Sequence, residues 1–323
     1  MTAPVDLGRG MSRAALDAAH GWAMARYHAC DVCPERCGVD RHAGELGVCG
    51  LGAGARVYKE YLHLGEERCL VPSHAIYLAG CNFRCAFCSD DRAVRTPLAV
   101  GVEVPPEALA RRIAERRAQG ATNVNFVGGL PDVNVLYALE VLRACPDDTH
   151  VVWNTNAWTT AEAVEKLTGV VGTWLIDLKF GSDRCALKLA GPRAYLETAH
   201  ARLAECAASP ANVIVRHLLM PGHLACCTLP VIAHVARRHP DVPLNLMTGY
   251  RPYRMGRGAG AMAGLVPDAE QVAAARALAA AGLRHPMVDG VALDGAVASE
   301  WAARAPRSEG APEDDAAGER RRA

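Results

Sequence analysis

The sequence contains few aromatic residues and no excess charge of either sign. Phenylalanine, tryptophan and tyrosine make up 5% of the 323 residues, too few to indicate a stacking platform for single-stranded nucleic acid. Lysine plus arginine equals aspartate plus glutamate, at 35 each, so no global field attracts nucleic acid or a lipid surface. We therefore expect no nucleic-acid partner.

Long apolar runs are also missing. The longest apolar stretches fall well short of the ~20 residues that a membrane helix requires. The N-terminal 30 residues contain no uninterrupted apolar region of the kind that a signal peptide has. We therefore expect no membrane association and a cytoplasmic location, where thiols stay reduced.

Cysteine, in contrast, is abundant, with 13 residues. Four lie within 30–49 and three within 81–88, and clustered cysteines in a reducing compartment indicate metal binding or catalysis rather than disulfides. Cys69 lies between the two groups, and we interpret it as a lone cysteine. The dispersed cysteines are interpreted as small buried hydrophobic residues; they are Cys145, Cys185, Cys206, Cys226 and Cys227.

Composition divides the chain into three regions. Residues 1–70 carry cysteines and many glycines and are expected to be an irregular metal- or cluster-binding segment. Residues 71–292 alternate short apolar runs with alanine-rich amphipathic stretches. Residues 303–323 are charged, contain proline and lack bulky apolar side chains, so we predict a disordered tail.

The middle region is predicted to form repeated strand–helix units. Six strands are expected, at His74–Ala79, Asn123–Val127, His150–Asn154, Thr173–Leu178, Asn212–Leu218 and Pro243–Met247. Six helices follow them, at Pro106–Gln119, Asp132–Ala144, Thr160–Leu167, Arg193–Ala207, Leu229–Arg238 and Asp268–Ala281. This α/β alternation predicts a partial (β/α)6 TIM-like barrel with an irregular N-terminal cysteine-rich segment. A flat doubly wound sheet is the alternative, weakened because no GxGxxG follows the first strand.

Three cysteines directly follow the first predicted strand, in the sequence GCNFRCAFC. Cys81, Cys85 and Cys88 are soft thiolate ligands of the kind that iron–sulfur clusters require, and a loop of eight residues can wrap one cluster. The absence of a fourth cysteine leaves one iron open to an outside molecule. A zinc site that borrows a distant cysteine is the alternative, but the position after a strand favours a cluster.

This Cx3Cx2C motif, with aromatic Phe87 before its third cysteine, resembles the signature of radical S-adenosylmethionine (SAM) enzymes. The resemblance implies a [4Fe–4S] cluster whose open iron binds SAM. It also implies that an electron from the cluster releases a 5′-deoxyadenosyl radical.

Polar or glycine residues follow the later strands, at the edge where active sites of such barrels collect. Gly128 and Gly129 are similar to the family's GGE motif, but Leu130 replaces the acid, so only the backbone contribution to SAM binding carries over. Asn154, Thr155 and Asn156 stand at the end of the third strand, and a SAM contact and simple turn formation are equally consistent with these polar residues.

The fourth strand ends in a D-x-K sequence, Asp177 and Lys179, similar to that of enzymes that activate glycyl radical enzymes. A carboxylate can bind ribose hydroxyls, and an ammonium group can pair with a carboxylate. On the fifth strand Arg216 and His217 are neighbours, so only one of them faces the barrel. For each, a SAM contact competes with a salt-bridged or hydrogen-bonded role at the edge of the core.

The N-terminal cysteines form a second pattern, Cys30, Cys33, Cys37 and Cys49. Four thiolates complete a coordination sphere, which suits either a structural zinc or an electron-relaying iron–sulfur cluster. Together with the motifs above, this run resembles the uncharacterised PflX-type iron–sulfur branch related to pyruvate formate-lyase activating enzymes.

These features predict a radical SAM oxidoreductase that activates a glycyl radical enzyme by hydrogen abstraction. Flavodoxin or ferredoxin is the electron donor that the resemblance implies, and the glycyl radical enzyme is the protein substrate. Two alternatives remain, which are modification of a small molecule and a non-catalytic iron–sulfur or zinc scaffold.

Overall fold

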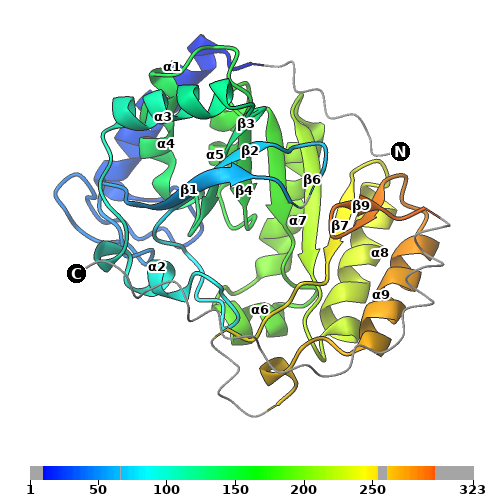
Figure 1. Ribbon diagram of the computed structural model, residues 1–323. Helices are drawn as coiled ribbons and strands as arrows, with labels where there is room; N and C mark the ends of the chain where they lie inside the picture. Colours follow the sequence, from blue (N-terminus) through cyan, green and yellow to red (C-terminus); the bar gives the residue numbers. More distant parts are fainter. Residues whose placement is uncertain (1–9, 66, 254–259, 295–323) are drawn as a thin grey trace, which may run out of the picture.

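The computed structural model describes residues 10–65, 67–253 and 260–294 (Figure 1). The predicted tail at 303–323 lies outside these described residues. A single curved sheet forms the centre, with its strands hydrogen-bonded in sequence order from β1 to β9. The strands are β1 (Val57–His63), β2 (Ser73–Leu78), β3 (Asn123–Gly128), β4 (Val151–Thr155), β5 (Thr173–Asp177), β6 (Asn212–Leu218), β7 (Leu244–Met247), β8 (Pro286–Val288) and β9 (Val291–Ala292).

Strands β2 to β8 are parallel, and an antiparallel strand lies at each end of the sheet. The predicted α/β fold class is confirmed, and all six predicted strands are present with boundaries shifted by one residue at most. Strand β8 extends the parallel series beyond the prediction. Because β1 and β9 end the strand order, the sheet is an open, partial barrel.

The helices surround the outside of the curved sheet (Figure 1). They are α1 (Arg13–Arg26), α2 (Asp91–Arg95), α3 (Pro106–Ala118), α4 (Val135–Arg143), α5 (Ala161–Leu167), α6 (Asp183–Ala190), α7 (Tyr195–Ala208), α8 (Leu229–Arg238) and α9 (Asp268–Ala280). Local signals set their ends: Pro106 begins α3, Gly120 follows it at positive φ, and the Thr160 hydroxyl caps α5 by accepting a bond from Ala163. Figure 1 places α2 and α6 at the same end of the sheet.

The N-terminal segment is irregular where its cysteines lie, but a helix and a strand flank that part. Helix α1 is capped by Ser12 and buries Leu16, Ala19 and Ala23, which recur on one face at helical spacing. It packs against α4 and α5. Strand β1 pairs antiparallel with β2. The cysteine-bearing run is therefore held between two elements that belong to the barrel.

The core has two layers, one on each face of the sheet. Along β4, Val151 and Trp153 face the helices, whereas Val152 faces the inside of the curve. This alternation follows from the two-residue repeat of a strand. The apolar cluster on the inner face is small and includes Leu175 and Ile214. Buried polar side chains occupy the rest of the interior.

In the described part of the chain, every helix falls short of the length and apolar character needed to span a membrane.

Candidate functional site

The loop after β2 carries the three predicted cluster ligands. Gly80 opens the loop at a φ of +86°, where a Cβ would come within 2.4 Å of the Leu51 side chain, so glycine is required there. Cys81 and Cys85 are buried, and Cys88 is partly buried. Two backbone bonds hold the loop to the end of α6, since the amides of Arg84 and Ala86 donate to the carbonyls of Ala190 and Leu189 at 2.9 and 2.7 Å.

Aromatic side chains gather around this loop although the chain has few. Three of its four phenylalanines lie here. Phe83 packs on Tyr195, and Phe87 packs edge-on against Phe180. Trp158 lies against Phe83. These rings form an apolar wall that keeps water from the thiols.

Burial controls the protonation of the three thiols. It raises the pKa of Cys85 to about 12, although the nearby Lys179 ammonium acts in the opposite direction. Burial and the neighbouring Cys85 likewise raise the pKa of Cys81. Without a metal these groups therefore stay neutral, and a bound metal would favour their thiolate forms.

The sulfur atoms of the three loop cysteines are not arranged as the ligands of one ion. Within residues 10–65, 67–253 and 260–294, one group of His, Cys, Asp or Glu side chains has ligand atoms all within 4.8 Å of one another, and it contains none of the three loop cysteines. A tetrahedral zinc would need sulfur atoms ~3.8 Å apart, from Zn–S bonds of about 2.3 Å. The three sulfur atoms therefore do not all lie within 4.8 Å of one another, and they do not form the ligand set of a single tetrahedral ion.

The three thiols line a cavity of about 270 Å³ at the carboxyl ends of the strands. The predicted cofactor residues Gly128, Gly129, Asn154, Asp177 and Lys179 all line the same cavity. The structure therefore brings five of the seven predicted cofactor-binding residues next to the predicted cluster ligands, as expected where parallel strands end together.

Asp177 is the last residue of β5, and Lys179 follows it two residues later in the loop. The Lys179 ammonium donates to an Asp177 carboxylate oxygen at 2.7 Å, and each side chain is about a quarter exposed. Despite burial, Asp177 and Cys85 raise the pKa of Lys179, so the ammonium stays charged. The cavity thus presents a cation beside the thiols and an anion next to it.

Close backbone contacts explain why positions 128 and 129, at the end of β3, are glycines. A Cβ on Gly129 would lie 2.0 Å from the Gly80 carbonyl oxygen, and one on Gly128 would lie 2.8 Å from the backbone of β2. Gly129 also donates its amide to the Leu78 carbonyl at 2.6 Å. The pair lets this strand end meet the start of the cysteine loop.

The acid missing from the GGE-like motif is not replaced by the next acid in sequence. Asp132 is buried and accepts a bond from the Trp153 indole at 3.3 Å, and it does not line the cavity. Burial raises the pKa of its carboxyl to about 6. Leu130 itself lines the cavity.

Asn154 and Asn156 both line the cavity. Asn156 in addition has the turn-forming role that is the alternative to a SAM contact. Asn156 accepts a bond from the Trp158 amide and donates to Asn82, both at 2.9 Å. The Trp158 indole in turn donates to Glu35 in the N-terminal cysteine run, at 2.9 Å. A polar network therefore connects the two cysteine regions.

Arg216 and His217 are not among the residues that line this cavity. Arg216 faces the inside of the barrel, where its Nε donates to Glu67 at 2.7 Å. His217 faces outward and is held between the Leu178 carbonyl and the Thr228 hydroxyl at 2.6 and 3.0 Å. Burial lowers the pKa of His217 to about 4, so its ring is neutral. The expected alternation of the two is confirmed, and both side chains have the structural partners that were the alternative to a SAM contact.

The N-terminal cysteines lie against the cluster loop. Cys30, Cys33 and Cys49 are buried, and the Cys49 carbonyl is 3.2 Å from where a Cβ on Gly80 would be. The buried Arg41 guanidinium acts on Cys49 by lowering its pKa, against the larger effect of burial. The four thiols are outside the tight group described above, so no three of their sulfur atoms all lie within 4.8 Å of one another.

Sequence reasoning missed one constellation. Cys185, Cys226 and Cys227 were predicted to be dispersed buried thiols, but the structure brings their sulfur atoms together around His223. That prediction is wrong because the turn after β6 folds back onto α6. A local signal was present in the sequence, since His223 and two adjacent cysteines form an H-x2-C-C motif.

Comparisons with known proteins relate part of the chain to one family. A family model described as "Radical SAM superfamily" matches residues 76–226. Uncharacterized protein MJ0674 of Methanocaldococcus jannaschii is 36% identical over 231 residues, which are 69% of this chain and 66% of that protein. The chain thus spans just under two thirds of the length of this relative.

Two solved structures also resemble the chain in part. Streptococcus suis SuiB bound to S-adenosylmethionine is 16% identical, with a TM-score of 0.42 over 53% of this chain and 40% of that one. TYW1 with a lysine–pyruvate adduct bound is 14% identical, with a TM-score of 0.43 over 63% of this chain and 72% of that one.

Proposed function

We propose that the protein is an enzyme that reductively cleaves SAM in the cavity beside Cys81, Cys85 and Cys88, since residues 76–226 match the model of the radical SAM superfamily. One observation carries this proposal. The three thiols share the cavity with strand-end polar groups, and no fourth cysteine is among the residues that line it. When bound, a [4Fe–4S] cluster would supply the electron that divides SAM into methionine and a 5′-deoxyadenosyl radical, which then takes a hydrogen atom from the substrate.

The protein's own residues have distinct roles in this proposal. Lys179 offsets the negative charge that thiolates introduce, because its ammonium acts on Cys81 and Cys85. Asp177 is placed to accept hydrogen bonds from ribose hydroxyls, and the backbone of Gly128 and Gly129 offers polar groups without side chains. The aromatic wall around the loop excludes water from a reactive radical.

We further propose that the hydrogen donor is a glycine of a partner protein, a glycyl radical enzyme. Two features support this choice. The cavity contains the D-x-K pair that resembles such activating enzymes, and the strand order ends at β1 and β9 instead of closing into a complete barrel. Membership of the PflX-type branch stays a prediction.

The electron would come from flavodoxin or ferredoxin, and the N-terminal cysteines would hold a second iron–sulfur cluster on its path. Four thiolates suit a structural zinc and a cluster alike, so the choice of a cluster is based on where the thiols lie. Their position supports the route, because the Cys33 thiol contacts the side chain of Asn82, next to Cys81.

The first test measures 5′-deoxyadenosine by mass spectrometry after anaerobic reconstitution, reduction with dithionite and addition of SAM. The wild type should form the nucleoside, and Cys85→Ala should lose this activity at least a hundredfold. Cys145→Ala is the matched control, since Cys145 is a buried thiol far from the cavity. A reduced protein that retains its iron and forms no nucleoside would overturn the proposal.

The second test concerns the substrate. Pyruvate formate-lyase labelled with dideuterated glycine serves as the probe, and deuterium in the 5′-deoxyadenosine together with a glycyl radical signal is expected. SAM cleavage without deuterium transfer or radical formation would reject glycyl radical activation and leave SAM cleavage itself intact.

A further inference from the structure

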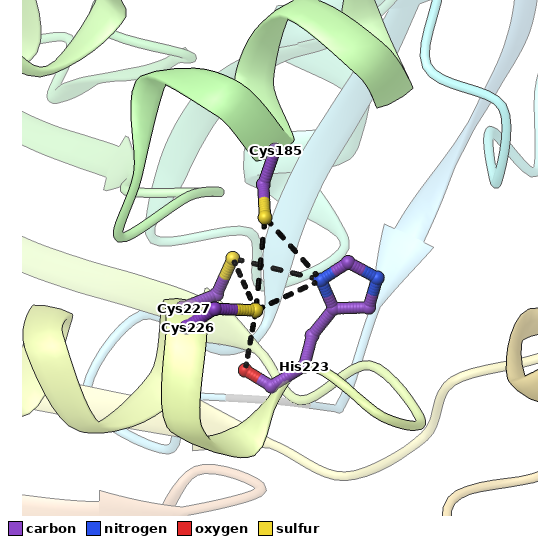
Figure 2. A group of neighbouring side chains, drawn as sticks. All are labelled: Cys185, His223, Cys226 and Cys227. Atoms are coloured by element: carbon purple, nitrogen blue, oxygen red, sulfur yellow. Dashed lines mark hydrogen bonds between the residues drawn. The ribbon is translucent and has the colours of Figure 1, made fainter.

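Four metal-ligand side chains meet at one point outside the cavity. Figure 2 shows Cys185, His223, Cys226 and Cys227 directed toward one another, and one ligand atom from each lies within 4.8 Å of all the others. Cys185 comes from α6, and the other three come from the connection between β6 and α8. Cys227 is buried, and His223 and Cys226 are partly buried.

The distances between these atoms match the edges of a tetrahedron around one zinc ion. From His223 Nδ1, the sulfur atoms of Cys226, Cys185 and Cys227 lie at 3.4, 3.6 and 3.8 Å. Cys226 Sγ lies 3.6 Å from Cys185 Sγ and 4.0 Å from Cys227 Sγ. Bonds of about 2.3 Å to sulfur and about 2.05 Å to nitrogen give tetrahedral edges of ~3.8 Å between sulfurs and ~3.6 Å between sulfur and nitrogen.

The local backbone accounts for this convergence. The Ser182 hydroxyl caps α6 by accepting a bond from the Cys185 amide at 3.2 Å, which fixes the turn that carries Cys185. Residues Leu224–Thr228 form a π-helix, which is a widened helical turn. Such turns are rare in proteins overall, and those that occur are often at functional sites. Gly181 allows close approach, because a Cβ there would lie 2.4 Å from the Cys227 carbonyl oxygen.

We propose that Cys185, His223, Cys226 and Cys227 bind one zinc ion as a closed Cys3His site. Three soft thiolates and an imidazole are a ligand set that zinc prefers in structural sites, and four protein ligands leave no open position for catalysis. A disulfide explains the geometry less well. It would join two of the three sulfurs at about 2.05 Å and leave the third thiol and the imidazole without a function.

The position of this site suggests what the ion stabilises. The site joins the first turn of α6 to the β6–α8 connection, 38 residues later in the chain. The last turn of α6 holds the cluster loop through the bonds from Arg84 and Ala86 described above. The ion therefore fixes the helix against which the Cys81–Cys88 loop is positioned.

This inference does not depend on SAM cleavage, so its test needs neither a cluster nor activity. The full-length protein, purified in the presence of a thiol reductant, is analysed for zinc by elemental analysis. The wild type should hold about one equivalent more than His223→Ala or Cys226→Ala. Cys145→Ala should retain the full content, because its buried thiol lies outside the site.

A variant that is expected to fold gives a positive readout. His223→Cys should keep the ion, and in the Co²⁺-substituted protein its visible ligand-field absorption should shift from that of three thiolates and one nitrogen to that of four thiolates. Equal zinc content in all variants, an unshifted Co²⁺ spectrum, or a Cys185–Cys226 disulfide in metal-free wild type would each overturn the proposal.

Discussion

Replacing Arg216 by methionine should destabilise the protein strongly, because it leaves the Glu67 carboxylate buried without its cation. Glu67 and Arg216 are 1% and 8% exposed, and Arg216 binds both carboxylate oxygens. Asn245 donates to the same carboxylate at 2.7 Å. Although burial alone would raise it, these partners hold the pKa of Glu67 below its usual value.

Removal of one partner of such a buried pair costs about 3–5 kcal/mol, because the other charge remains in the interior. For a chain of this size the entropy of unfolding is about 0.6 kcal/mol per kelvin, so Tm should fall by about 5–8 °C. The double variant Glu67→Leu/Arg216→Met should recover most of this loss, since an apolar pair leaves no uncompensated charge. Recovery should be incomplete because the Asn245 amide loses its acceptor.

The assay is denaturant unfolding followed by circular dichroism, with Arg284→Met as the surface control. Arg284 pairs with Asp241 at 2.7 Å, but both side chains are mostly exposed, so its loss should change stability by less than about 1 kcal/mol. A loss below about 1 kcal/mol for Arg216→Met, or a double variant as unstable as the single one, would refute the reasoning. So would a raised KM for SAM at unchanged stability, which would make Arg216 a cofactor contact.

The same pair sets a pH dependence. Because the folded state depresses the pKa of Glu67, its stabilisation is present above the unfolded value of about 4.5 and is lost as pH falls below it. The free energy of unfolding of the wild type should therefore decrease on acidification more steeply than that of the double variant.

Four further substitutions test other parts of the structure. Asp132→Asn should raise the free energy of unfolding by about 2–3 kcal/mol at pH 7 and change it little near pH 4. Burial raises the pKa of the Asp132 carboxyl from 3.8 to about 6. The stability of the wild type therefore falls as pH rises from 3.8 to about 6. Identical pH profiles of the two proteins would contradict this. Gly129→Ala should destabilise by more than about 2 kcal/mol, since its Cβ would meet the Gly80 carbonyl. Gly21→Ala in α1, where a Cβ meets nothing within 4 Å, should instead stabilise by up to about 1 kcal/mol in the same unfolding assay. Lys179→Met should raise the KM for SAM about tenfold or more at unchanged iron content, because a charged hydrogen-bond donor leaves the cavity; an unchanged KM would remove Lys179 from SAM binding.

Local patterns were sufficient to predict strands β2 to β7 and the position of the cavity, but not β1, β8 or β9. Strands such as Asn212–Leu218 are short apolar runs bounded by turn residues, and each predicted strand forms near the expected residues. Because parallel strands end at one edge, strand order alone places Asp177 and Gly128 near the cysteine loop.

Contacts between distant segments could not be predicted in the same way. The Glu67–Arg216 pair joins residues 149 apart, and nothing in either local sequence identifies the partner. Alternation along β6 predicted that one of Arg216 and His217 faces inward, but it could not tell which one. Likewise, the H-x2-C-C motif at 223–227 lacks a fourth ligand until α6 brings Cys185 to it.

The spacing of thiols distinguishes the metal sites that ligand type alone leaves ambiguous. Cysteine sulfur serves both zinc and iron–sulfur clusters, so counting cysteines cannot separate these two kinds of site. Of the cysteine sets in the described chain, only that of Cys185 has the short edges of a single tetrahedral ion. Neither the Cys81–Cys88 loop nor the 30–49 run has three sulfur atoms that all lie within 4.8 Å of one another. Helix α6 carries Cys185 in its first turn and binds the Cys81–Cys88 loop through its last turn. A zinc ion bound at Cys185 can therefore hold that loop in position through the helix.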